Sequence, residues 1–290
     1  MKVIALLQVY NEEMFVEHAI MNRLKYVDQI IVTEGKLTPF GNLPMRSTDA
    51  TRSIVERLSL KYKNVILLDP LPESAFSNCV NREACEGLNK NYMLSHSSVE
   101  DNDIIHILDC DEFYTNAGIS FIIDTFKNND SLLNVLIMEY QFAYDLKHYF
   151  DSGHTGRWMR FKNGSKFKDT NHFLVNGEDI SADRNVVIDR EDSGVYHLCW
   201  TKPPKLIREK VISFNRPRFT AWFNKVYLMW PLNSQQAYYN NYIITGKSGF
   251  CEGQPHLLKL LEWSLPKEIK MLSSISYWDD VIENHEKYII

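Results

Sequence analysis

Residues Ile104–Leu108, IIHIL, run directly into residues 109–113, DCDEF, and these ten positions give the strongest indication of the fold. A short apolar run of this kind is typical of a strand buried on both faces of a parallel sheet. Asp109 and Asp111 then stand where the strand opens into a loop. Mg²⁺ and Mn²⁺ prefer oxygen ligands and commonly use one or two protein carboxylates together with substrate phosphates. This position therefore indicates a divalent metal site that holds a diphosphate.

The same carboxylate spacing occurs again in Asp101 and Asp103, which precede the strand. Carboxylates there lie at the opposite edge of the sheet, so position and not spacing separates the two pairs. A chain of this composition gives roughly one such pair by chance. The alternative for Asp109 and Asp111 is a pair of solvated or helix-capping aspartates.

Apolar runs alternate with amphipathic segments through residue 140, which predicts a mostly parallel sheet flanked by helices. The predicted strands are residues 3–9, 29–33, 65–68, 104–108 and 133–140, and the predicted helices are residues 13–26, 49–62, 78–95 and 117–128. Ser47, Thr48 and Asp49 form an N-cap cluster for the second helix. Later segments predict strands at 184–188 and 194–199 and a helix at 205–214. We expect one continuous α/β domain with a mixed sheet.

Three polar clusters follow predicted strands, namely residues 8–13, Glu34 with Gly35, and Asp109 with Asp111. Ligands of open α/β sheets bind beyond the carboxyl ends of the strands. If these strands are parallel, the three clusters meet in one crevice.

Composition removes several classes of protein. The net charge of −5 gives no overall basic field for nucleic acid. The five cysteines show no C-x-x-C spacing, so neither a disulfide framework nor a structural zinc site is indicated. No apolar run approaches the roughly 20 residues of a membrane helix, and a cytoplasmic protein is expected. A G-x-G-x-x-G motif is absent, and Asn241 replaces the leading glycine of a P-loop before Gly246-Lys247-Ser248.

Four segments in residues 1–113 resemble the GT-A glycosyltransferases of the broad family 2 type. Residues 9–13 resemble the "YNEE" loop after the first strand, and residues 47–51 resemble the "GSTDGT" element, with residues 36–46 as an insertion. Asn81-Arg82 resembles a helix that carries an arginine near the donor. Asp109-Cys110-Asp111 resembles the DxD motif, which binds a metal and a nucleotide sugar.

The resemblance implies a GT-A-like, Rossmann-type mixed sheet with an elaborated C-terminal acceptor region. Residues 1–140 are then the nucleotide-sugar-binding half, and residues 141–290 bind the acceptor and close the site. Mn²⁺ or Mg²⁺ is the implied cofactor, with Asp109 and Asp111 as ligands. The implied donor-binding residues are Val9, Tyr10, Asn11, Glu34, Arg82, Asp109 and Cys110.

The C-terminal half carries a second, shorter resemblance. Residues 194–200, GVYHLCW, with Lys210 and Arg218-Phe219, are similar to a segment of glycosyltransferase family 17. GT-A enzymes often complete the metal shell with a late histidine, which makes His197 a candidate third ligand. The alternative is a core histidine hydrogen-bonded within a strand, and His106 is most simply a core residue.

An inverting transfer needs a base to deprotonate the acceptor hydroxyl. Glu191-Asp192 resembles the "ED" pair of family 2, so Asp192 is the first candidate and Glu191 the second. The alternative is an ordinary charged turn, and a retaining enzyme needs no such base. Several aromatic residues are candidates for stacking on sugar rings or for the core: Trp158, Trp200, Trp222, Phe223, Trp230, Tyr238 and Tyr239.

The leading hypothesis is a metal-dependent hexosyl- or pentosyltransferase that uses a nucleotide-sugar donor, first of all a UDP-sugar. The second is a sugar-phosphate nucleotidyltransferase, although such enzymes carry a glycine-rich basic loop where this chain has Tyr10-Asn11-Glu12-Glu13. The third is a non-catalytic carbohydrate-binding protein on a degenerate transferase fold. The acceptor stays open between a glycan, a lipid-linked glycan, a protein and a modified nucleic acid.

Overall fold

The computed structural model describes residues 1–36, 44–143, 148–151, 154–170, 172–180, 185–202, 204–214 and 259–260. The chain divides into two compact units. The first comprises Met1–Met138 and His154–Val195, and the second comprises Glu139–Gly153 and Tyr196–Ile290. Residues 154–195, which we placed in the acceptor half, thus belong to the unit built on the N-terminal half. That one half of the chain binds the donor and the other half binds the acceptor stays a prediction.

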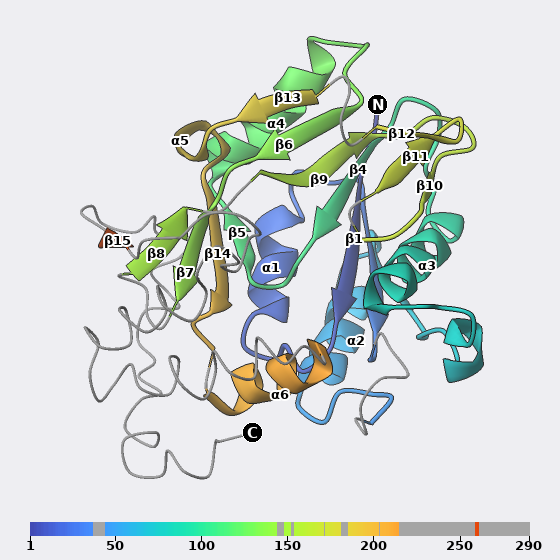
Figure 1. Cartoon of the computed structure of the whole chain (residues 1–290), viewed down its shortest axis with the longest axis vertical. Helices are drawn as coiled ribbons and strands as arrows, with labels where there is room; N and C mark the ends of the chain where they lie inside the picture. Colours follow the sequence, from blue (N-terminus) through green and yellow to red (C-terminus); the bar gives the residue numbers. More distant parts are fainter. Residues whose placement is uncertain are drawn as a thin grey trace. The chain divides into compact units, whose positions relative to one another are not determined.

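A seven-stranded mixed sheet forms the centre of the first unit (Figure 1). Its spatial order is β13 (Asn185–Ile188), β6 (Asn134–Ile137), β9 (Thr155–Arg160), β4 (Ile104–Leu108), β1 (Val3–Val9), β2 (Gln29–Glu34) and β3 (Val65–Leu68). The β4, β1, β2 and β3 strands are parallel to one another, as β13 is to β6. Only β9 runs antiparallel to both of its neighbours. The predicted mixed sheet flanked by helices is confirmed.

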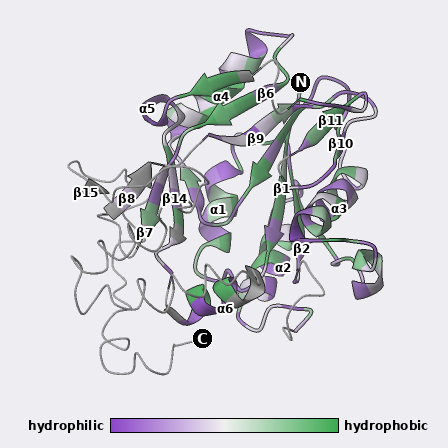
Figure 2. Ribbon diagram, in the orientation of Figure 1, coloured by the Kyte–Doolittle hydropathy of each residue, from purple (hydrophilic) through white to green (hydrophobic). Residues whose placement is uncertain are grey.

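Both faces of β1, β2 and β4 are buried almost throughout, which explains their largely apolar sequences. Successive side chains alternate between the faces, so Ile4 and Leu6 share one face and Ala5 and Leu7 share the other. Figure 2 shows green apolar residues along most of β1. The α3 helix (Arg82–Ser95) packs against β1 and β2 and adds Met93 to the core. The α2 helix (Thr51–Lys61) packs against β2, β3 and α1 (Val16–Arg23).

A small antiparallel sheet extends the core on the side of α3. It consists of β10 (Lys166–Phe167), β11 (Phe173–Val175) and β12 (Glu178–Asp179). The buried rings of Phe167 and Phe173 lie 4.8 Å apart and belong to the same core cluster as Ile4 and Met93. These strands were not predicted, because each is only two or three residues long.

Several predicted boundaries are wrong by a few residues. The α2 helix begins at Thr51, and its N-cap is Ala50 without a side-chain hydrogen bond, not the predicted cluster. The predicted helix 13–26 is the shorter α1, because residues 13–15 and 24–26 form turns. Predicted strand 133–140 splits into β6 and β7 (Tyr140–Ala143). Asn81 caps α3, and Thr115 caps α4 (Asn116–Lys127) through a hydrogen bond from the Gly118 N–H.

In the second unit the strands lie side by side in the order β15 (Lys259–Leu260), β8 (His148–Asp151), β7 and β14 (Val195–Trp200). The predicted helix 205–214 follows β14 in the sequence as α6 (Pro204–Phe214). Trp158 and Trp200 are buried. The other five aromatic candidates lie outside the described residues. So do Arg184, at the start of a predicted strand, and Arg218-Phe219. Among the described helices, none is long and apolar enough to cross a membrane.

Candidate functional site

Three adjacent parallel strands bring the polar clusters to one edge of the sheet in the first unit (Figure 1). In the sheet β1 lies between β4 and β2, with Leu7 opposite Leu108 and the buried Val9 opposite Glu34. The carboxyl ends of these strands therefore lie side by side. Asp109 follows Leu108, and Tyr10 follows Val9. The parallel arrangement that we expected for these clusters is confirmed.

Hydrogen bonds join the loop after β1 to the loop before α2. The N–H of Asn11 donates to Oγ of Ser47 at 3.0 Å, and Oδ1 of Asn11 accepts from the N–H of Thr48 at 2.9 Å. The N–H of Glu12 donates to Oγ1 of Thr51 at 2.7 Å. Asn11 has a positive φ of 52°, a conformation that asparagine tolerates better than most residues. The two segments matched by the resemblance thus form one connected surface.

A second pair of bonds completes this connection. The N–H of Glu13 donates to Oδ2 of Asp49 at 3.2 Å, and Oε2 of Glu13 accepts from the N–H of Ala50 at 2.9 Å. Asp49 also accepts from the N–H of Thr51 at 3.0 Å. The polar residues that looked like an N-cap cluster therefore tie two loops together as well as serving the start of α2.

Glu34 is fully buried at the end of β2. Its Oε1 accepts from the N–H of Ser47 at 2.7 Å, and its Oε2 lies 3.4 Å from Arg46 and 3.3 Å from Arg52. Arg46 also donates to Asp69 at 2.8 Å. Burial lowers the pKa of Arg46, but the contacts with Asp69 and Glu34 outweigh it and raise that pKa. Glu34 thus organises the loop and two arginines, and a direct contact with the donor stays a prediction.

Asp109, the first aspartate of the pair after β4, contacts a residue that we did not predict. Nη2 of Arg157, on β9, donates to Oδ2 of Asp109 at 2.7 Å and lies 2.6 Å from Oε1 of Glu112. The Asp109 side chain is 43% exposed, and that of Glu112 is 0% exposed. Cys110 and Asp111 are buried between them. Oxygen ligands at the end of a strand, one of them open to solvent, fit Mg²⁺ or Mn²⁺.

Lys90 on α3 adds a buried positive charge to this region. Its Nζ donates to the Thr170 carbonyl at 3.0 Å. Burial lowers the pKa of Lys90, and the positive charge of Arg157 lowers it further. The carboxylates of Glu86 and Asp109 act in the opposite direction. The charges of Asp109 and Arg157 therefore reach this ammonium group.

Arg82 is the first residue of α3, and its Nε donates to Oε1 of Glu86 at 2.6 Å. The side chain is 31% exposed. This is an i, i+4 pair on a helix surface, which typically contributes only a few tenths of a kcal/mol. A role in donor binding stays a prediction.

A network of buried side chains packs next to the end of β4. Arg23 is fully buried, with its guanidinium 4.0 Å from the centre of the Tyr114 ring, and it donates to the Glu112 carbonyl at 3.2 Å. Its Nε donates to Nε2 of His106 at 3.2 Å. The His106 ring stacks on Trp158 at 3.8 Å, which confirms that His106 is a core residue. We missed Arg23, because nothing local in an amphipathic helix marks an arginine that faces the core.

Burial sets the titration of this network. It lowers the pKa of His106 well below the usual range, and Arg23 acts in the same direction. Burial also lowers the pKa of Arg23 to about 10 and raises that of Tyr114. A neutral His106 accepts at Nε2 from Arg23 and donates from Nδ1 to the Arg157 carbonyl, 3.3 Å away. This tautomer connects the helix arginine to the strand that carries Arg157.

Glu191 and Asp192 are exposed on the short helix α5 (Arg190–Ser193), which follows β13. Ser193 donates to the Met138 carbonyl at 2.7 Å and fixes this turn. Because β13 is parallel to β4, α5 lies at the same edge of the sheet, three strand positions away, or roughly 14 Å. The structure does not bring the pair into contact with Asp109. Its role as base stays a prediction.

His197 lies on β14 in the second unit and is 9% exposed. Its Nδ1 lies 3.0 Å from Oε1 of the buried Glu139 in the same unit. A carboxylate behind one ring nitrogen is the usual arrangement for a histidine that ligates a metal through the other. The same contact satisfies a structural histidine, so metal binding by His197 stays a prediction.

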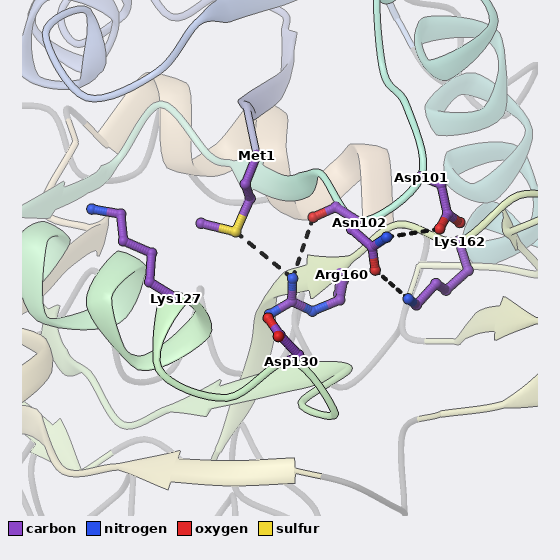
Figure 3. A pocket seen from close by; sticks show the side chains of 7 residues that line it. All are labelled: Met1, Asp101, Asn102, Lys127, Asp130, Arg160 and Lys162. Carbon is purple, nitrogen blue, oxygen red and sulfur yellow. Dashed lines mark hydrogen bonds between the residues drawn. The ribbon is translucent and has the colours of Figure 1, made fainter.

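The second carboxylate pair is structural. Asp103, just before β4, accepts from the N–H groups of Lys2 at 2.6 Å and Glu100 at 2.9 Å. Asp101 and Asn102 line a cavity of about 480 Å³, which Figure 3 shows together with Met1, Lys127, Asp130, Arg160 and Lys162. The Arg160 guanidinium donates to the carbonyl groups of Asn102 and Phe126, so its charge serves the backbone. Position before the strand separates this pair from Asp109 and Asp111, as expected.

No family model matches the sequence, and no curated protein matches it. Among solved structures, the chain is similar to glucosyl-3-phosphoglycerate synthase from Mycobacterium tuberculosis in complex with Mn²⁺, UDP and glucosyl-3-phosphoglycerate. The identity is 17% and the TM-score 0.33, over 47% of this chain and 43% of that chain. For the same enzyme in complex with UDP, the identity is 16% and the TM-score 0.35, over 49% of this chain and 45% of that chain.

The chain is also similar to mannose-6-phosphate isomerase from Helicobacter pylori, at 12% identity and a TM-score of 0.31, over 60% of each chain. It spans less than half the length of the synthase structures. Likenesses at this level assign neither a family nor an activity to this chain.

Proposed function

We propose that the protein is a metal-dependent glycosyltransferase that moves a sugar from a nucleotide-sugar donor to an acceptor hydroxyl. The observation that carries this proposal is the meeting of three polar strand ends on adjacent parallel strands. The exposed carboxylate of Asp109 lies at one of them, and the connected loops around Asn11 and Ser47 lie at the next. Crevices at this edge of an α/β sheet are where such ligands bind.

Each group has a role that its surroundings favour. Asp109 and Asp111 supply oxygen ligands for Mn²⁺ or Mg²⁺. The loop surface from Tyr10 to Glu13, joined to residues 47–51, receives the nucleoside. A bound divalent cation neutralises the charge that develops on the diphosphate as it leaves. Arg157 adds positive charge at the same carboxylate.

Two further roles come from the sequence. Asp192 is the proposed base for an inverting transfer, with Glu191 as second candidate. His197, oriented by Glu139 within the second unit, is the proposed third ligand. The donor class proposed first is a UDP-sugar, on the resemblance to GT-A enzymes. The acceptor stays unassigned.

The experiment that tests this function is a screen of nucleotide sugars for Mn²⁺-dependent release of nucleoside diphosphate. We expect one donor, first of all a UDP-sugar, to be hydrolysed or transferred, and excess chelator to stop the release. Asp111→Asn should abolish it, whereas Asp101→Asn, a change in the structural pair, should not. Full activity in chelator would contradict the proposal. Release of pyrophosphate from a nucleoside triphosphate and a sugar phosphate would indicate a nucleotidyltransferase instead.

A further inference from the structure

One nitrogen of Arg157 contacts two carboxylates that differ sharply in exposure. Nη2 lies 2.7 Å from Oδ2 of Asp109 and 2.6 Å from Oε1 of Glu112. The Asp109 side chain is 43% exposed, the Glu112 side chain is 0% exposed, and that of Arg157 is 14% exposed. The guanidinium thus stands between an accessible carboxylate and an inaccessible one.

The two contacts have different consequences. A buried carboxylate needs a nearby positive charge, since removal of one partner of a buried ion pair is strongly destabilising. Glu112 therefore holds Arg157 in place. Asp109 is different, because an exposed carboxylate loses little when water or another cation replaces its partner. Of these two contacts, the one to Asp109 is the exchangeable one.

The backbone also fixes Arg157. On β9 it directly precedes Trp158, which pairs with His106 on β4. The Arg157 carbonyl lies 3.3 Å from Nδ1 of His106. A side chain anchored by its strand and by Glu112 can leave Asp109 without leaving the site.

We propose that Arg157 is an internal counter-charge of Asp109, and that a divalent cation displaces it when it binds Oδ2 of Asp109. This inference rests on the proposed role of Asp109 as a metal ligand. Arg157 weakens the binding of metal alone, because metal and guanidinium compete for the same carboxylate oxygen, Oδ2 of Asp109. A nucleoside diphosphate adds negative charge that both cations share. Metal and nucleotide therefore bind cooperatively, and Arg157 is a positioning residue that increases this coupling.

Isothermal titration with MnCl₂ alone, without nucleotide, tests the competition. Loss of Arg157 by itself would remove a positive charge 2.6 Å from the buried Glu112 and could disturb folding, so the comparison is between Glu112→Gln and Glu112→Gln/Arg157→Met. We expect the double variant to bind Mn²⁺ about tenfold more tightly, the scale of one charge-assisted hydrogen bond. A residue with only a structural role would give weaker binding instead. Arg57→Met, which removes an exposed arginine paired with Glu17 at 2.7 Å, is the matched control and should leave Mn²⁺ affinity unchanged.

The outcomes separate the inference from the proposed function. Equal or weaker Mn²⁺ binding by the double variant, with clear binding by the wild type, overturns the competition and leaves the glycosyltransferase proposal standing. Absence of Mn²⁺ binding in the wild type, with and without UDP, overturns both.

If the double variant does not fold, a crystal structure of the wild type with Mn²⁺ and UDP decides the question. We expect Arg157 to have left Asp109 while its Nη2 stays within about 4 Å of Glu112, the range of an ion pair. An intact Arg157–Asp109 bond beside a bound Mn²⁺ would overturn the inference.

Discussion

Oδ1 of Asn11 accepts a hydrogen bond of 2.9 Å from the N–H of Thr48, and it does so from a left-handed backbone with a φ of 52°. One side chain thus joins the loop after the first strand to the loop before α2. The segments lie 37 positions apart in the sequence. Their connection requires both an acceptor at this position and a residue that tolerates a positive φ.

Asn11→Ala should lower the free energy of unfolding by about 1–3 kcal/mol, because alanine loses the acceptor and is strained at a positive φ. Asn11→Gly is the control: it loses the same bond but accepts the backbone conformation, so we expect about half that cost. Denaturant unfolding of the three proteins measures both values. Equal stabilities of the alanine and glycine variants would show that the backbone conformation is unimportant.

Stability should fall in acid because of His106. Burial lowers its folded-state pKa well below the unfolded value near 6.5, so below that pH the unfolded chain binds a proton that the folded chain does not. Its contribution is fully present above about pH 6.5 and is lost, by up to about 1.4 kcal/mol per pH unit, as pH falls toward the folded pKa. His106→Gln removes this titration while keeping an acceptor for Arg23. The free energies of unfolding of the wild type and His106→Gln, measured from pH 5 to 7.5, should therefore approach each other as the pH falls. A constant difference over this range would contradict the prediction.

Gly118 should tolerate no side chain. A Cβ there would lie 1.9 Å from the Ser193 carbonyl oxygen, at the contact between α4 and α5. Gly118→Ala should cost about 3 kcal/mol or more, as overpacking against backbone does. Gly164→Ala is the control, since its Cβ meets nothing within 4 Å and only its φ of +84° is strained, at about 1 kcal/mol. Thermal unfolding of both variants gives the comparison, and similar midpoints would show that α5 moves freely.

Asp192→Asn should lower kcat by about 10²–10⁴-fold if Asp192 deprotonates the acceptor, because the amide cannot take a proton. UDP affinity should be unchanged. Glu191→Gln alters the neighbouring exposed carboxylate and should retain activity. The measurement is transfer to the acceptor once the donor is known. Full activity of both variants would favour a retaining reaction or a different base.

The sequence predicts the parallel part of the sheet well, because β1 and β4 are continuous apolar runs buried on both faces. It misses β9, whose first residues, Thr155, Gly156 and Arg157, have the composition of a loop. That strand pairs with β4 and β6 only through long-range hydrogen bonds. Local pattern therefore contained no signal for the strand that completes the site.

The site shows the same limit. Asp109 and Asp111 are identifiable because they directly follow an apolar strand. Arg157 is 48 positions from Asp109 and becomes its partner only through the pairing of two strands. The polar cluster of residues 47–49 is recognised, but its role is read as a helix cap, because its partners in the loop after β1 are equally distant in sequence. Roles that depend on nearby residues are predictable here, and those that depend on topology are not.

The most direct test of the central claim is the thermal unfolding midpoint with MnCl₂ and UDP, added separately and together. Wild-type protein should be stabilised by the two ligands together more than by the sum of their separate effects. In the presence of MnCl₂, UDP at a hundredfold excess over its Kd should contribute about 2.7 kcal/mol. Asp111→Asn should lose this stabilisation, and Asp101→Asn should keep it. A wild-type midpoint that does not move with both ligands, or an Asp111→Asn protein stabilised as strongly as the wild type, would contradict a metal and nucleotide site at the end of β4.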